Sequence, residues 1–107
     1  MTDVYLPNRD DVLNHVISTP VTGVVTVTAT AAEIFAGATR LPGRRKMIIK
    51  NEDLVLRIRV GGLSLTQQNG FPIEPGAVLE LDFDPTVDTP IYAISEGVAV
   101  SVAVMEY

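Results

Sequence analysis

The sequence contains no cysteine and no tryptophan, only one histidine, and no base after Arg59. Without cysteine the chain can form no disulfide, no thiolate nucleophile and no zinc–sulfur site. No apolar run approaches the roughly 20 residues of a membrane span, and no basic and then apolar leader opens the chain. We therefore expect a soluble, unsecreted protein with no membrane partner. Its 107 residues leave room for one domain with an ordinary core.

Because no base follows Arg59, the basic residues all lie in the first part of the chain and the last part carries only acids. The formal net charge is −5. One interpretation is a basic patch that contacts an acidic partner. The other is pairing of basic strands with acidic neighbours in one sheet. Nucleic acid is not an expected partner, because the chain is acidic overall and few aromatic residues accompany the bases. The patch hypothesis assigns partner contact to Arg44, Arg45, Lys46, Arg57 and Arg59.

Residues 1–20 differ from the rest and predict an N-terminal arm. Asn8 is a candidate N-cap, and Asp10 and Asp11 follow where the helix dipole favours acids. Pro20 ends the helical pattern, so we expect a short helix over residues 9–17. So short a helix needs a cover for its apolar face, either its own domain or a neighbouring subunit. The predicted contact residues on that face are Val12, Leu13, Val16 and Ile17.

Residues 21–107 alternate apolar and polar side chains with the period of strands. "TGVVTVTAT" predicts a half-buried strand, and "AAEIFAGA" fits either a strand or one helical turn. "RKMIIKN" and "LVLRIRV" predict a hairpin around "NED", with Leu54 and Val55 on opposite faces of its second strand. Asn69-Gly70 and Glu74-Pro75-Gly76-Ala77 predict two turns, the second of type II.

The later strands carry the clearest alternation. Phe71 and Ile73 are spaced to bury together, and "AVLELDF" should turn its leucines and Phe83 inward. In "VAVSVAVME" one face carries Val98, Val100, Val102 and Val104, and the other carries Ala99, Ser101, Ala103 and Met105. Neither face is polar, which predicts a strand covered on both sides, central in a sheet or at a subunit contact.

These patterns together predict an all-β fold. We expect an antiparallel β-sandwich or jelly-roll-like barrel of six to eight short strands over residues 21–107. The N-terminal arm with its short helix, residues 1–20, precedes it.

Residues suited to chemistry are few. The one histidine, His15, lies in the predicted arm helix, and no serine sits in a nucleophile-elbow sequence. We expect no enzyme and no cofactor. Asp82, Asp84 and Asp88 could supply oxygen ligands to calcium, but their spacing lacks the glycine and closing glutamate of an EF-hand, which favours a solvated acidic loop.

The order of the motifs resembles a known group of proteins. "GRRKMIIKN" leads to a strand ending in Gly61-Gly62, and a loop with Asn69-Gly70 precedes "FPIEPG" and an alternating strand. "IYAIS" and a valine-rich last strand that ends in an acid follow. This order is similar to that of small β-sandwich virion proteins of tailed bacteriophages, over roughly Val24 to Tyr107.

The resemblance implies a non-enzymatic role in the virion. Such proteins are head decoration, cement or head-fibre components, made in the host cytoplasm and located at the capsid surface. The implied partners are the major capsid protein, or another virion protein, and further copies of the chain in a homo-oligomer. A tail or fibre adhesin for a surface glycan and a head-to-tail connector component are the alternatives.

Overall fold

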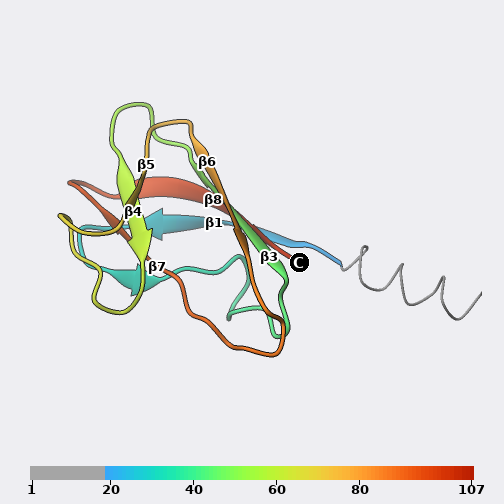
Figure 1. Ribbon diagram of the computed structural model, residues 1–107. Coiled ribbons are helices and arrows are strands. Elements are labelled where there is room, and N and C mark those ends of the chain that lie inside the picture. Colours follow the sequence, from blue (N-terminus) through green and yellow to red (C-terminus); the bar gives the residue numbers. More distant parts are fainter. Residues whose placement is uncertain (1–18) are drawn as a thin grey trace, which may run out of the picture.

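A computed structural model describes residues 19–107, and within this range the chain is all β (Figure 1). This confirms the predicted all-β class. The predicted helix over residues 9–17 and the arm residues Val12, Leu13, Val16 and Ile17 lie outside the described residues. The eight strands are β1 (Val21–Val27), β2 (Ala32–Glu33), β3 (Lys46–Asn51), β4 (Ile58–Gly61), β5 (Phe71–Ile73), β6 (Val78–Asp82), β7 (Tyr92–Ser95) and β8 (Val100–Glu106).

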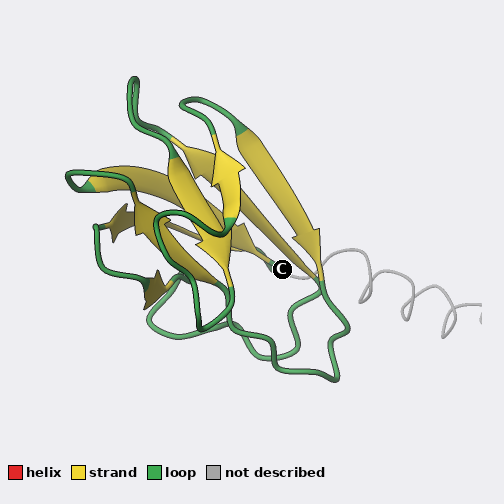
Figure 2. Cartoon of the chain, turned by 60° about the vertical axis from the view of Figure 1, so that its left-hand side comes forward, coloured by secondary structure: helices red, strands yellow, loops and turns green. Residues whose placement is uncertain are grey.

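The strands form two four-stranded sheets in the orders β1-β8-β3-β6 and β2-β7-β4-β5. Every pairing is antiparallel. β4 and β5 are the only consecutive strands that pair, so the other connections carry the chain from one sheet to the other (Figures 1 and 2). The two sheets therefore form two layers, and most pairings join segments far apart in the sequence.

One hydrophobic core joins the two sheets, as in a sandwich. Burying each large aliphatic side chain contributes about 1.5–3 kcal/mol, so this core supplies most of the favourable free energy of folding. The strands of both sheets contribute to it: Val27, Met47, Ile49, Ile58, Val60, Ile73, Ala93, Val100, Val102 and Val104 are all buried.

The sequence pattern holds best in β6 and in the turns. Leu79 and Leu81 pack against the core, while Glu80 and Asp82 are exposed, as predicted. Gly70 and Gly76 have φ values of 119° and 77°, in the region that favours glycine. The amide of Ala77 donates to the carbonyl of Glu74 at 2.9 Å, which closes the predicted turn.

The predicted hairpin around "NED" is wrong, because β3 and β4 belong to different sheets. Leu54 and Val55 lie in the connection between them and are 92% and 80% exposed, and β4 begins only at Ile58. The buried side chain of Asn51 accounts for the change of sheet. Its amide donates to the carbonyls of Leu56 at 2.8 Å and Ile73 at 3.0 Å, which turns the chain out of the first sheet.

Two further burial predictions are wrong. Val98 is 72% exposed and lies in the turn before β8, where the hydroxyl of Ser95 donates to its carbonyl at 2.7 Å. Phe71 is 61% exposed although Ile73 is buried. Phe71 begins β5, which is the edge strand of its sheet, so the core does not extend far enough to cover its ring.

β8 is central, between β1 and β3, as one of the two predicted placements requires. Val100, Val102 and Val104 are buried in the core. The opposite face is not covered within residues 19–107: Ser101 is exposed, and Ala103 and Met105 are half-buried. The prediction of two covered faces therefore holds for one face of β8 in the described part of the chain.

A buried ion pair closes one end of the sandwich. The carboxylate of Glu106, at the end of β8, is fully buried and bound by the guanidinium of Arg44, itself only 4% exposed. Glu106 also accepts from the amide of Ala36 at 2.8 Å, and Arg44 donates to the carbonyl of Thr89. The guanidinium carbon lies 4.3 Å from the centre of the Phe83 ring. One pair thus connects four segments distant in sequence.

Gly23 makes this arrangement possible. A Cβ atom at Gly23 would lie 2.2 Å from the carbonyl oxygen of Ala36, which real structures do not tolerate. The bare backbone of β1 allows the segment at Ala36 to come close to the sheet. There the amide of Ala36 reaches Glu106. A glycine in this strand therefore marks a close backbone approach.

We predict that removing either charge of the buried pair destabilises the protein, because the other charge is then buried without a partner. Arg44→Met leaves a buried unpaired carboxylate and should lower the free energy of unfolding by about 3–5 kcal/mol. Glu106→Gln retains an acceptor for Ala36 but leaves the guanidinium unpaired, so a similar loss is expected. The double variant should be more stable than Arg44→Met alone. Denaturant unfolding of all four proteins measures this coupling.

The control is Lys46→Met, which removes an exposed pair with Glu80 at 3.5 Å. Its cost should stay within about 1 kcal/mol, as for surface ion pairs in general. If the losses from Arg44→Met and Glu106→Gln simply add in the double variant, the two charges are not coupled.

Candidate functional site

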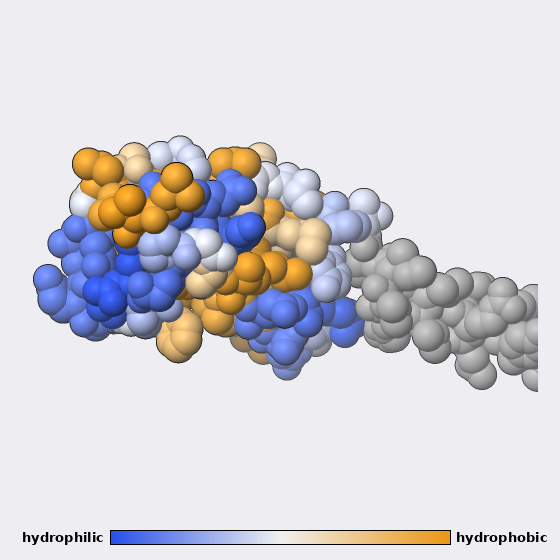
Figure 3. Space-filling view, turned by 90° about the horizontal axis from the view of Figure 1, so that it is seen from above, coloured by the Kyte–Doolittle hydropathy of each residue, from blue (hydrophilic) through white to orange (hydrophobic). Residues whose placement is uncertain are grey.

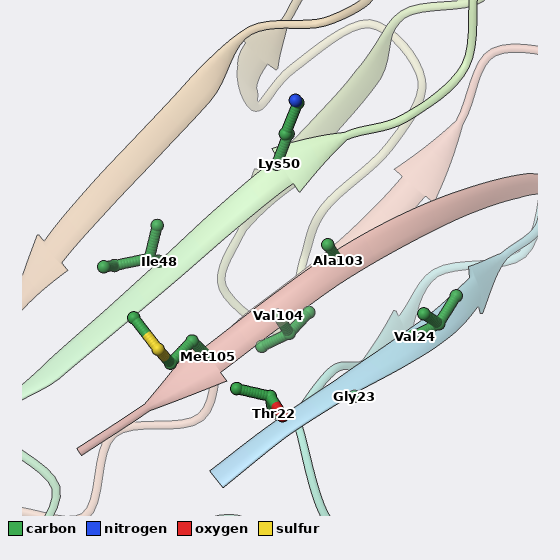
Figure 4. A pocket seen from close by; sticks show the side chains of 8 residues that line it. All are labelled: Thr22, Gly23, Val24, Ile48, Lys50, Ala103, Val104 and Met105. Carbon is green, nitrogen blue, oxygen red and sulfur yellow. The ribbon is translucent and has the colours of Figure 1, made fainter. Parts of the chain in front are cut away.

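A hollow lies on the outer face of the β1-β8-β3 sheet, opposite the core (Figure 4). We call it the outer groove. Its volume is about 330 Å³. Figure 4 shows that its side chains come from three neighbouring strands. The lining residues are Thr22, Gly23 and Val24 of β1, Ile48 and Lys50 of β3, and Ala103, Val104 and Met105 of β8.

The strand register explains the hollow. Met105 pairs with Thr22 on one side and Ile48 on the other, which forms one row of side chains across three strands. Ala103 pairs with Val24 and Lys50 and forms the next row. The small side chain of Ala103 lies in the middle of larger neighbours, so it leaves a space that they surround.

Lys50 is the one charged residue of the outer groove. Its side chain is exposed, and it forms no ion pair with any residue from 19 to 107. Val24, opposite it across β8, is 70% exposed. The site therefore offers apolar surface with a single positive charge at one side, which suits an apolar protein segment that carries an acid.

A second hollow, of about 370 Å³, lies where the edge strands β5 and β6 leave the sandwich open. Its lining is entirely apolar: Val60, Gly61, Phe71, Leu79, Leu81 and Ile91. The exposed ring of Phe71 lies at this opening. No polar side chain lines it, so it lacks the convergent polar groups of a specific small-molecule site.

A third, more polar pocket of about 200 Å³ lies between residues 40–44 and 85–89. Arg40 is its accessible cation, but its guanidinium binds Glu33 at 2.6 Å and Asp88 at 2.6 Å. These two carboxylates, Glu33 first, raise the pKa of Arg40. Arg44, on the same pocket, is bound to Glu106. Both guanidinium groups are thus neutralised by the protein itself.

The structure does not bring the five predicted basic contact residues together. Arg44 is buried with Glu106, and Lys46 lies on β3 with Glu80 and Asp82, each at 3.5 Å. Arg57 directly precedes β4, in the other sheet, and Arg59 belongs to it. Their guanidinium groups both bind Glu96, at 2.8 and 2.9 Å. Arg45 is exposed and has no ion pair within the described range. Four of the five basic residues are therefore paired with acids of the same chain, as the pairing interpretation expects. Their pairs are distributed over two sheets rather than one.

Glu96 is the centre of a half-buried charge cluster with Arg57 and Arg59. The Arg57 guanidinium, aided by Arg59, holds the pKa of Glu96 below its ordinary value of 4.5. Two other carboxyl groups behave alike: the amides of Leu56 and Val55 lower the pKa of Asp53, and Thr86 lowers that of Asp84. In each case hydrogen bonds favour the charged form.

The acidic residues proposed for calcium are directed to other partners. Asp82 pairs with Lys46 and Asp88 with Arg40, while Asp84 accepts from the hydroxyl of Thr86 at 2.7 Å. Among residues 19–107, no three His, Asp or Glu side chains gather in a group that could hold a metal ion. His15 lies outside the described residues.

The outer groove could not be predicted from the sequence alone. The absence of a polar face on the last strand is a signal for it. The strand order is not in that pattern, because β1 and β3 meet β8 only after long crossovers. Rows such as Thr22–Met105–Ile48 cannot be assembled without that register.

No helix within residues 19–107 is long and apolar enough to cross a membrane. In comparisons with known proteins, no family model matches the chain and no curated protein matches it.

We predict a loss of stability in acid that depends on Glu96. Its pKa is lower in the folded than in the unfolded state, so the unfolded chain binds the proton first as the pH falls below about 4.5. This contribution is complete above that pH and disappears as the pH passes the lowered value. Glu96→Gln should reduce stability at pH 7 and give a shallower decline between about pH 5 and pH 3, measured by urea unfolding.

The matched control is Glu52→Gln, since Glu52 is exposed and forms no ion pair with the described residues. It should leave the pH profile unchanged. An unaltered profile in Glu96→Gln would exclude this carboxylate as a source of acid sensitivity.

Proposed function

We propose that the protein is a non-enzymatic structural protein of a bacteriophage virion. More specifically, we propose a capsid decoration or cement protein that contacts the major capsid protein and further copies of itself. The order of sequence motifs described above supports the phage assignment. The surface of the domain supports a role in permanent contacts between proteins.

The strand order gives support at the level of the fold. Sheets ordered β1-β8-β3-β6 and β2-β7-β4-β5 follow the connectivity of an eight-stranded jelly roll. Viral capsid domains use this fold, and so do lectin domains. Because one fold serves many functions, the surfaces of the domain are more informative about its role than its topology.

The observation that carries the proposal is the contrast between paired charges and uncovered aliphatic side chains. Most basic groups are neutralised within the domain, as described above. Leu54, Val55 and Val98 are 92%, 80% and 72% exposed. An apolar surface of this kind favours burial against another protein.

These three residues belong to two connections that meet at one end of the sandwich. Arg57, in the β3–β4 connection, binds Glu96, in the β7–β8 connection, at 2.8 Å. The amide of Glu52 also donates to the carbonyl of Ser101, at the start of β8, at 3.1 Å. Figure 3 views the domain from above and includes this end, where apolar surface lies beside hydrophilic surface. We name Leu54, Val55 and Val98 the loop contact.

The loop contact of one copy supplies a modest free energy of binding. Burying three aliphatic side chains contributes on the order of 5 kcal/mol before the cost of association. That is weak for one copy. An oligomer that places several such contacts on one capsid gains from their effective concentration. A small domain with a modest contact is therefore sufficient when it acts as a multimer.

We predict that the protein is a component of purified particles of the phage that encodes it. Mass spectrometry should detect it in a fixed ratio to the major capsid protein. Its absence from purified particles would contradict the proposal. Particles made without it should take up the added protein, and Leu54→Ser/Val55→Ser/Val98→Ser should reduce this binding at least tenfold.

The control for the loop contact is Val87→Ser. Val87 is 56% exposed and follows β6, at the opposite end of the sheet from the β3–β4 connection. This variant should bind particles like the unaltered protein. Binding that survives the triple substitution but is removed by free sugar or by chelation of calcium would favour the adhesin alternative.

A further inference from the structure

The outer groove has no cover among the described residues, although its lining is mostly apolar. Val24 is 70% exposed, and Ile48, Ala103 and Met105 are only half-buried. The row of Val24 and Ala103 continues through Lys50 to Val78 of β6, which is 55% exposed. Uncovered aliphatic side chains gathered on one sheet face favour packing against another element or another protein.

The chain that precedes β1 supplies a matching apolar segment. Val12, Leu13, Val16 and Ile17 repeat at the spacing of one helical face. Residues 18–20 are all that separate this segment from Val21, where β1 begins. The segment is therefore joined by a short connection to β1, whose residue Thr22 lines the outer groove.

The dimensions also match. A helix over residues 9–17 would be roughly 14 Å long at 1.5 Å per residue. The three strands of the outer groove span about 10 Å, which is two strand spacings. Such a helix crosses the whole groove, and the hollow above Ala103 leaves space for its branched side chains.

The charges are complementary. Among the described residues, Lys50 is the only charged one that lines the outer groove. The first turn of the predicted helix contains Asp10 and Asp11, directly before its first apolar residue, Val12. An acid in the first turn can reach a lysine at the side of the groove while the following apolar residues cover its centre.

Pro20 restricts how the chain can enter β1. Proline fixes its own φ, and it keeps the residue before it, Thr19, out of the helical region. The chain is thus extended where it meets β1, whereas packing onto its own groove requires an immediate reversal toward Val24. Only Ser18 and Thr19 would be left to make that reversal.

We propose that residues 9–17 of one copy pack into the outer groove of a second copy. Val12, Leu13, Val16 and Ile17 contact Ala103, Ile48 and Met105, and an acid of the first turn pairs with Lys50. Each copy has both an arm and a groove, so we include in the proposal that the exchange is reciprocal or cyclic and gives a closed, symmetric oligomer. This inference specifies the self-contact of the proposed virion protein.

Disulfide trapping tests the exchange, because the natural chain has no cysteine to interfere. Full-length Val16→Cys and Ala103→Cys chains with different tags are mixed and oxidised. A disulfide requires Cα atoms within roughly 4.4–6.8 Å, so it reports direct packing. We expect a heterodimer that contains both tags. A mixture of Val16→Cys and Val87→Cys chains, the control, should give at least tenfold less.

The Val16→Cys/Ala103→Cys double variant separates the two possible arrangements. Cross-linked dimers or larger species support exchange between copies. A monomer with an internal disulfide overturns it, as does the absence of any link. If circular dichroism shows that Ala103→Cys does not fold, Thr22→Cys, at an exposed position of β1, replaces it.

The result of the cross-linking experiment does not depend on whether the protein is a virion component. A protein present in particles but without exchanged arms would remain a virion component. Exchanged arms in a protein absent from particles would leave the self-contact intact and exclude the proposed function.

Discussion

The ion pair between Arg44 and Glu106 holds the described domain together at the end where its connections converge. Glu106 terminates the central strand β8, and Arg44 leads into β3. Through Ala36 and Thr89 the pair also fixes the two longest connections around that end. Among the described residues no buried side-chain nitrogen or oxygen lacks a hydrogen-bond partner. A buried charge pair is tolerated when its remaining groups are satisfied in this way, and it then specifies one arrangement of the chain.

The pairing of basic residues with acids of the same chain leaves few free charges on the surface. Arg44, Arg57, Arg59 and Lys46 all bind carboxylates of the same chain, so they have little charge left for a partner. Aliphatic side chains stay uncovered at the loop contact at one end and in the outer groove on one sheet, among the described residues. Association through such surfaces depends on shape and burial rather than on chemistry at a reactive group. That is the requirement for a protein whose work is to add stable contacts to an assembly.

The sequence predicted the fold class and the local pattern well, because both depend on alternation within single strands. The leucines of β6 and the glycine turns at 70 and 76 are examples. It failed where tertiary contacts decide. Leu54 to Val60 has the composition of one strand, and charged and apolar residues alternate from Leu56 onward. Yet the side chain of Asn51 redirects the chain to the other sheet. The buried state of Arg44 was equally hidden, since an arginine in a basic run is ordinarily exposed and its partner lies 62 residues away.

The central claim is that this is a self-associating structural protein, and the molar mass of the full chain in solution tests it most directly. Light scattering after size exclusion, over a concentration series, gives that mass without labels or substitutions. We expect a closed oligomer whose mass is a fixed multiple of the 11.5 kDa chain mass and which persists on dilution. A mass of one chain at every concentration would contradict it.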